Sequence, residues 1–331
     1  MKKRVFVTGG TGVVGGWVVR LLIDEGFEPV VYDLRPSFEF LAGVEDKFKF
    51  VQGDITDLPA VKKAIEENGA KEIVHLAALV FGDSQRDPYR GYSVNVTGSI
   101  NMFEAARTLG IKKVVFISSR AVYTDFLGEY AHPTYKPVPE EFHRDPQNVY
   151  GATKQAVEQA AFSFCNQYEG LSITGLRFPS MYGPGRLARH GSVAQLSTLI
   201  ESAMLGIPYD VPQGSDQRDD LIYVKDAARA VVMALMADTS GYNILNIGSG
   251  KNISFGELVV SLNKVIKGGK ITVGPGLDFL NSGVSATRYC FLDISKARKM
   301  IGCEAAYDIE TGIADYAATM NELGFKPLGD G

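Results

Sequence analysis

The sequence predicts an α/β protein built on a doubly wound, mostly parallel sheet, with a smaller C-terminal lobe. Short apolar runs rich in Val, Ile and Phe alternate with longer amphipathic stretches, as in parallel strands joined by crossover helices. Most of the runs are continuous in apolar residues, which indicates strands covered on both faces. A glycine-rich turn follows the first run and opens a helical pattern.

In chain order, the apolar runs predict strands near residues 4–8, 29–33, 48–52, 72–77, 113–118, 172–178 and 243–247. The amphipathic stretches predict helices near residues 13–25, 57–67, 93–109, 150–169, 193–205, 225–237, 254–266 and 309–323. Gly26 and Gly110 are well placed as helix stops. These elements supply the alternating pattern of a doubly wound sheet.

The alternation weakens after residue 178, and the segments 181–185 and 273–276 are rich in turn formers. We therefore expect two parts. The first, residues 1–178 plus about 225–249, contains the main sheet. The second, about 179–224 and 250–331, forms a substrate-binding lobe.

Composition excludes several classes of protein. The 331 residues are 45% hydrophobic, enough for a large core, and the formal charge of -4 offers no basic footprint for nucleic acid. The three cysteines have neither metal-like spacing nor the count of a secreted disulfide framework, so we expect no metal and a cytoplasmic location. The N-terminal apolar run is too short for a signal peptide, and no run approaches the ~20 residues that span a bilayer.

The glycine-rich turn contains Gly10-x-Gly12-x-x-Gly15 between the first strand and the first helix. In that context glycines permit a tight turn and close approach to a pyrophosphate, which the helix N-terminus attracts. An isolated match is often an ordinary turn, but Asp33 ends the second strand where a carboxylate meets the adenosine ribose. A 2'-phosphate would be repelled there, so NAD is favoured over NADP, with the nearby Arg35 as a qualification.

Tyr150 and Lys154 are four residues apart at the start of a predicted helix, so they share one face. A nearby ammonium stabilises a phenolate, and a fall in the tyrosine pKa from 10 to about 7 needs roughly 4 kcal/mol. Such a phenolate can take the proton of an alcohol whose carbon loses a hydride. Ser119 ends a strand at the ligand-facing edge and can orient the reacting oxygen. The pattern predicts a catalytic Ser119, Tyr150 and Lys154.

Together these motifs, with Gly53-Asp-Ile-Thr-Asp57, His75-Leu-Ala-Ala78 and Ser118 to Tyr123, resemble the extended short-chain dehydrogenase/reductases, specifically their NAD-dependent epimerase/dehydratase group. The likeness covers nearly the whole chain and implies a Rossmann-type domain. It also implies dimers through the helices near 93–109 and 150–169. The cofactor-binding residues that it implies are Gly9, Gly12, Val13, Val14, Gly15, Asp33, Leu34, Asp54, Ile55, Leu76, Ala77, Ala78, Asn95, Tyr150, Lys154 and Phe178.

The chain departs from this family at three places. Arg120 and Ala121 stand where the 4,6-dehydratases carry acid and base carboxylates, which disfavours dehydration. Asp219 and Ser180 stand where sugar-nucleotide epimerases commonly carry a diphosphate-binding arginine and a substrate asparagine. We expect Ser119, Ser180, Arg218 and Arg288 to contact substrate, with Arg186 and His190 as further candidates for an anionic group.

Three functions follow from these residues. The first is hydride transfer at a secondary alcohol of a sugar or sugar nucleotide, with epimerisation as the leading version. The second is net NAD-dependent oxidation of a non-nucleotide sugar or hydroxy acid, motivated by Asp219 and Ser180. The third is a non-catalytic NAD-sensing protein, against which the intact Ser119, Tyr150 and Lys154 argue.

Overall fold

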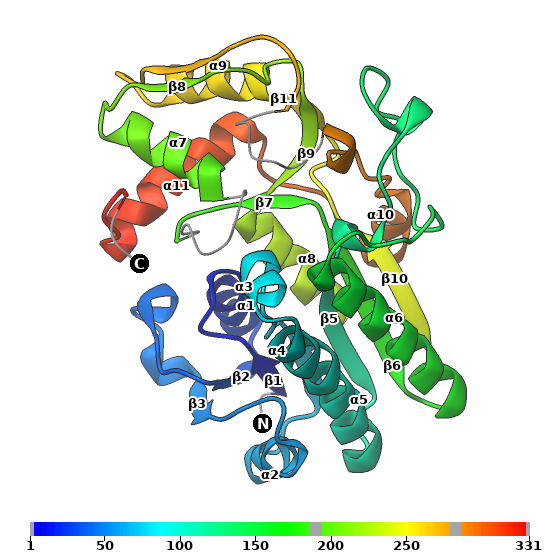
Figure 1. Ribbon diagram of the computed structural model, residues 1–331. Coiled ribbons are helices and arrows are strands. Elements are labelled where there is room, and N and C mark those ends of the chain that lie inside the picture. Colours follow the sequence, from blue (N-terminus) through cyan, green and yellow to red (C-terminus); the bar gives the residue numbers. More distant parts are fainter. Residues whose placement is uncertain (1–2, 186–193, 279–285, 329–331) are drawn as a thin grey trace.

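A seven-stranded parallel sheet forms the centre of the protein (Figure 1). The computed structural model describes residues 3–185, 194–278 and 286–328. The strand order is β10-β6-β5-β4-β1-β2-β3, so the direction of winding reverses between β1 and β4. All seven expected strands are present: β1 Arg4–Thr8, β2 Glu28–Asp33, β3 Lys49–Gln52, β4 Glu72–His75, β5 Lys113–Ser119, β6 Ser172–Phe178 and β10 Tyr242–Asn246.

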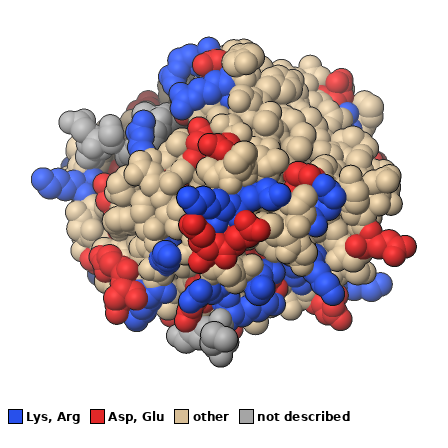
Figure 2. Space-filling model, turned by 90° about the horizontal axis from the view of Figure 1, so that it is seen from below, with Lys and Arg blue, Asp and Glu red and all other residues tan. Residues whose placement is uncertain are grey.

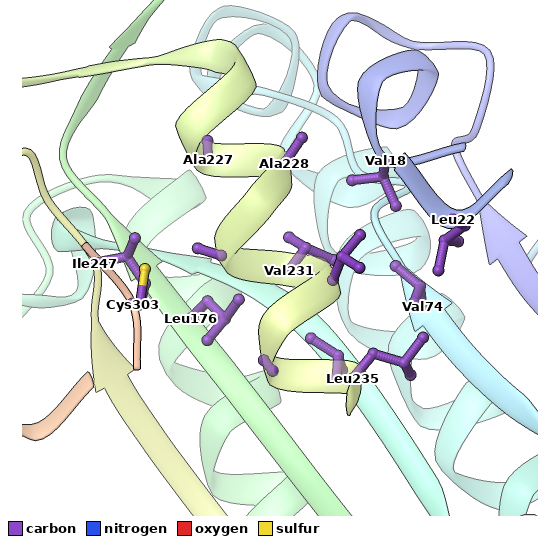
Figure 3. Packing of buried hydrophobic residues seen from close by; sticks show 14 of the residues in the cluster. Val18, Leu22, Val74, Leu176, Ala227, Ala228, Val231, Leu235, Ile247 and Cys303 are labelled. Atoms are coloured by element: carbon purple, nitrogen blue, oxygen red, sulfur yellow. The ribbon is translucent and has the colours of Figure 1, made fainter. Parts of the chain in front are cut away.

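Helices cover both faces of this sheet, which explains why every residue of β4 and β6 is buried. On one face, α1 (Val13–Asp24) and α8 (Val224–Met236) pack together over the strands. Figure 3 shows Val231 and Leu235 of α8 close to Leu22 of α1 and Val74 of β4. The other face carries α2 (Leu58–Asn68), α5 (Gly98–Leu109) and α6 (Val149–Gln167).

The second lobe contains two small sheets. One joins β11 (Asn252–Ser254), β9 (Arg218–Tyr223) and β7 (Ser180–Tyr182), and the other pairs β12 (Ile271–Val273) with β8 (Tyr209–Val211). Sequence patterns missed these five strands, because three to six residues carry too little periodicity. The expected helices are present as α7 (Ala194–Met204), α9 (Phe255–Val265) and α11 (Ile309–Leu323). The proposed boundary between the two lobes stays a prediction.

The expected helix near 93–109 has a different first turn. Residues Ser93–Thr97 form a π-helical segment that connects α4 (Pro88–Tyr92) to α5. Two further short helices, α3 (Phe81–Arg86) and α10 (Ser295–Ile301), have no counterpart in the sequence prediction. Gly110 ends α5 in the left-handed conformation, as expected of a helix stop.

The segment between β5 and α6 leaves the main sheet and packs against the second lobe. Phe126 and Val138 share a small apolar cluster with Cys290 and Leu292, and Val138 forms a parallel bridge with Leu292. The carboxyl-terminal edge of the sheet is therefore joined directly to the second lobe.

Charges of both signs are interspersed over the face of the molecule seen in Figure 2. Several are paired, as in Lys3 with Glu72 and Arg4 with Glu28. The helices in the described part of the chain include none with the length and apolar character needed to cross a bilayer.

Candidate active site

The residues predicted to act on ligands lie along one edge of the main sheet. Gly9 follows β1, Asp33 ends β2, Ser119 ends β5 and Phe178 ends β6. The carboxyl ends of parallel strands form a ligand crevice where the winding reverses, here between β1 and β4. The fold thus brings side chains from distant parts of the sequence to one edge of the sheet.

The glycine-rich loop has the close packing that a dinucleotide requires. Gly9 has a φ of +69°, and a Cβ at Gly15 would lie 2.0 Å from the Gly9 carbonyl oxygen. The N-cap of α1 is Gly12, which provides no side-chain acceptor for the first N–H groups of the helix. These donors suit a pyrophosphate. Val13 and Val14, the first two residues of α1, are half-buried beneath the loop.

The carboxylate of Asp33 lies beside the loop. One oxygen accepts hydrogen bonds from the Thr11 hydroxyl at 2.7 Å and the Thr11 amide at 3.3 Å, and the other accepts from the Leu34 amide at 2.8 Å. Sequence reasoning missed Thr11. The pair fixes a carboxylate at the end of β2, where it fits a ribose diol.

The remaining cofactor candidates surround this crevice. Leu34 exposes 48% of its surface beside Asp33, Asp54 is exposed after β3, and Ile55 is buried. Leu76, Ala77 and Ala78 form a half-buried strip after β4. The Phe178 side chain is only 1% exposed and packs in the core, so only its backbone is placed to meet a ligand.

Asn95 occupies the π-helical segment, and its side chain is fully engaged. Its amide oxygen accepts from the Leu79 amide at 2.7 Å, while its nitrogen donates to the Leu79 carbonyl at 3.0 Å and the Thr153 hydroxyl at 3.1 Å. Thr153 in turn donates to the Tyr150 carbonyl at 2.7 Å. Asn95 therefore braces the loop after β4 against the start of α6.

The brace continues to the glycine-rich loop through buried His75. Its Nδ1 lies 2.7 Å from the Thr8 hydroxyl and its Nε2 lies 2.9 Å from the Ser99 hydroxyl, which donates to the Asn95 carbonyl. Burial and the charge of Lys154 lower the pKa of His75 to about 3, so the ring is neutral. A continuous hydrogen-bonded chain thus joins the residue before Gly9 to the residue that carries the phenol.

Tyr150 and Lys154 lie on one face of α6, as the spacing predicts. The Lys154 ammonium is 5.6 Å from the centroid of the Tyr150 ring and donates to the Ile117 carbonyl of β5 at 2.8 Å. Burial lowers the pKa of Lys154 to about 8, against an opposing effect of Glu158 one turn along the helix. The amine is therefore held beside the phenol and titrates near neutral pH.

Ser119 ends β5, and its hydroxyl accepts a hydrogen bond from the Ala121 amide at 3.1 Å. Gly151, directly after Tyr150, lets α6 approach this segment. A Cβ at Gly151 would lie 2.1 Å from the Ala121 carbonyl oxygen. Sequence reasoning missed Gly151, although a glycine inside a helix often marks such an approach.

Replacing Gly151 with alanine should displace α6 from the Ser119 segment. We expect a loss of stability of about 1–3 kcal/mol from overpacking and a lower turnover rate in the protein that still folds. Urea denaturation and initial rates measure the two effects. Gly256→Ala, where a Cβ would lie 3.1 Å from the Ser215 carbonyl oxygen far from Tyr150, is the control. Equal effects of the two substitutions would contradict a positioning role for Gly151.

A buried ion pair supports α6 from below. The Glu158 carboxylate, which is completely buried, accepts from Arg177 at 2.8 and 2.6 Å and from Ser118 at 2.6 Å. Arg177 also donates to the Tyr123 hydroxyl and to the Glu140 carbonyl, both at 2.7 Å. These bonds connect α6, β5 and β6 next to the predicted catalytic residues.

The three departures from the family pattern meet at one place. Arg120 forms an ion pair with Asp219 and donates to the Ser180 hydroxyl at 3.0 Å. Burial opposes the charge of Arg120, but Asp219 outweighs it and raises the arginine pKa. The sequence shows each departure separately, and no local signal links Arg120 to residues 60 and 99 positions away.

The other arginines predicted to bind substrate are engaged elsewhere. Arg218 donates to the Asn252 carbonyl at 2.6 Å and pairs with Glu257 at 3.2 Å, while Arg288 pairs with Asp125 at 2.8 Å. Neighbouring residues of a strand point to opposite faces, which separates Arg218 from Asp219. Arg186 and His190 lie outside the described residues.

The model of the NAD-dependent epimerase/dehydratase family matches residues 5–248 of the chain. The chain belongs to this family. Its members have the extended short-chain dehydrogenase/reductase fold, and NAD is the cofactor. The predicted fold class, cofactor and enzyme type are thus confirmed. The roles given to individual residues stay predictions.

Named relatives in this epimerase/dehydratase family match almost end to end. The chain is 31% identical over 334 residues to a UDP-glucose 4-epimerase of Bacillus subtilis, covering 94% of this chain and 95% of the relative. It is 30% identical over 319 residues to a UDP-glucuronate 4-epimerase of Thermodesulfobacterium geofontis, covering 93% of each. A crystal structure of UDP-glucose 4-epimerase with UDP-glucose from Thermotoga maritima superposes with a TM-score of 0.81 at 25% identity, covering 96% of this chain and 99% of that one.

Proposed function

We propose that the protein catalyses NAD-dependent epimerisation at a secondary alcohol of a sugar or sugar nucleotide. The observation that carries this proposal is the position of the Lys154 ammonium over the Tyr150 ring, beside Ser119 at the end of β5. The named relatives, which are UDP-sugar 4-epimerases, favour a UDP-sugar substrate.

NAD, when bound, supplies a reversible hydride acceptor at the reacting carbon. The chain supplies the proton chemistry. The Ser119 hydroxyl orients the alcohol oxygen, the Tyr150 phenolate removes its proton, and the Lys154 ammonium stabilises that phenolate. In the return direction the Tyr150 hydroxyl gives the proton back to the same oxygen. The glycine-rich loop and Asp33 hold the pyrophosphate and the ribose.

A panel of UDP-sugars and their free sugars tests this proposal. We expect a 4-epimer to form from at least one UDP-sugar, with no net change in NADH absorbance. Steady accumulation of NADH without an epimer would reject epimerisation.

The second function is net oxidation of a non-nucleotide sugar or hydroxy acid. It is favoured by the Asp219 carboxylate, which pairs with Arg120. That carboxylate stands where the family commonly carries a diphosphate-binding arginine, and its ion pair with Arg120 leaves no net positive charge there. Net oxidation predicts exchangeable NAD and steady NADH production from a free sugar or hydroxy acid. The absence of NADH with every such compound would remove it.

The Lys154 pKa of about 8 predicts the alkaline limb of activity. As pH rises through about 8, the amine loses its charge and the phenolate loses its stabilising partner, so kcat/KM should fall. The measurement is kcat/KM between pH 6 and pH 10, with the fold checked at each pH by circular dichroism. A rate that stays level or rises between pH 8 and pH 10 would contradict this assignment.

Replacing Asp33 with serine should weaken NAD binding by roughly 10- to 100-fold, because a charged acceptor for two ribose hydroxyls is lost. NADP binding should improve, since the repulsion of its 2'-phosphate is removed. Titration calorimetry with both dinucleotides measures the change. Asp24→Ser, at the exposed end of α1, is the matched control. Unchanged selection between NAD and NADP in Asp33→Ser would refute this role.

We also propose a cytoplasmic homodimer. All three cysteines are free thiols in the structure, which suits a reducing compartment. Each expected interface helix exposes a large apolar side chain, Ile100 on α5 and Phe162 on α6. Light scattering of the purified protein at micromolar concentration should give twice the monomer mass of 35.9 kDa. Asp substitutions at both positions should restore that monomer mass.

A further inference from the structure

Arg120 is the residue of this crevice that the proton chemistry does not use. It directly follows Ser119, so its Cα lies about 3.8 Å from that of a residue proposed to touch the reacting oxygen. Its side chain is only 16% exposed, and its guanidinium carbon lies 5.7 Å from the centroid of the Tyr289 ring. A cation held this far from water is costly unless other groups satisfy its charge and its N–H donors.

The guanidinium is oriented by two protein groups. One terminal nitrogen binds an Asp219 oxygen, and the other donates to Ser180. Arginine and carboxylate commonly meet through two parallel bonds, but Asp219 uses one oxygen here. Within the described residues its second oxygen is buried with no hydrogen-bond partner.

Hydrogen bonds to Asp219 and Ser180 use two of the N–H donors of the Arg120 guanidinium, and the Cys290 thiol is a third neighbour. A guanidinium presents five N–H donors and no acceptor, so a group that completes it must offer oxygens. A carboxylate can accept two parallel N–H bonds at once, and such bonds are strengthened where water is excluded.

We propose that Arg120 is a specificity-determining residue that binds a carboxylate on the substrate, next to the alcohol that reacts. The substrate class is then an acidic sugar, with or without a nucleotide. Asp219 and Ser180 act as positioning residues, because they fix the plane of the guanidinium. This inference rests on the proposed function for the place of the reacting alcohol.

Binding measurements on the NAD-loaded protein test the inference separately from turnover. Titration calorimetry compares UDP-glucuronate with UDP-glucose, and glucuronate with glucose, because each pair differs by a carboxylate in place of a hydroxymethyl group. We expect the acid of at least one pair to bind at least 10-fold more tightly. Arg120→Lys keeps the charge but loses the planar fork, so the acid should weaken by roughly 10- to 100-fold and the neutral sugar by less than threefold.

Two further variants guard against a trivial result. The double variant Arg120→Met/Asp219→Asn removes the pair without leaving a lone buried charge, and it should abolish the preference for the acid while keeping a cooperative thermal transition. Arg229→Lys alters an arginine–aspartate pair on α8, whose Asp226 is also buried, and should change neither affinity.

Equal affinities for acid and neutral sugar in the unmodified protein, or no binding of any acid, would overturn the inference. So would equal weakening of both ligands by Arg120→Lys. Arg120-dependent binding of an acid without any epimer supports the inference while rejecting the proposed function. Epimerisation of a neutral sugar at a rate unaffected by Arg120→Lys would support the proposed function and reject the inference.

Discussion

Tyr150→Phe is expected to lower kcat by roughly 10²- to 10⁴-fold while leaving NAD bound. The substitution removes one hydroxyl, and with it the group proposed to exchange a proton with the substrate alcohol. The ring, α6 and the Lys154 contact with Ile117 are left in place. Initial rates with a substrate found by the UDP-sugar panel, together with NAD content after purification, measure the two quantities.

The matched control for this prediction is Tyr89→Phe, because Tyr89 is 88% exposed on α4 and is not one of the predicted catalytic residues. It should retain the full rate. A Tyr150→Phe protein that keeps a rate within threefold of the parent would show that the phenol does not carry the proton. Epimerisation and net oxidation would then both need another residue as acid and base.

Arg177→Met is expected to destabilise the fold by about 3–5 kcal/mol. Arg177 is 1% exposed and makes two of the bonds that balance the buried Glu158 carboxylate. Without it, that charge is left inside the protein with Arg144, at 3.2 Å, as its remaining ion-pair partner among the described residues. Urea denaturation followed by circular dichroism measures the loss.

Arg144→Met provides the comparison, since Arg144 pairs with the same carboxylate but exposes 38% of its side chain. Partly exposed ion pairs contribute about 1 kcal/mol or less, so this variant should remain close to the parent. Similar unfolding free energies for the two variants would contradict the importance given to the buried arginine.

Much of the main sheet could be predicted because its signals are local. Most of its strands are apolar runs flanked by turn formers, and the glycine-rich turn, Asp33, Ser119 and Tyr150 lie at recognisable distances from strand or helix ends. Parallel topology alone predicts that these residues lie at the carboxyl-terminal edge of the sheet. The strands of the second lobe lacked such signals, because β7, β8, β11 and β12 are only three residues long.

The contacts that complete the site could not be predicted, because they join distant segments. Arg120 forms an ion pair with Asp219, and Glu158 with Arg177, because the fold brings separate elements together. The sequence identified Arg218 as a substrate arginine, but in the structure it pairs with Glu257. Alternation along β9 turns Asp219, and not Arg218, toward Arg120.

The chain of bonds through Thr8, His75, Ser99, Asn95 and Thr153 has a mechanical consequence. The imidazole in this chain, that of His75, is neutral across the physiological pH range. A movement at one end of the chain can therefore shift the other end without a change in protonation. Loading of the nucleotide pocket should accordingly slow amide hydrogen exchange at the first turn of α6, which this chain of bonds links to the glycine-rich loop. The same slowing should be seen at pH 6 and pH 9.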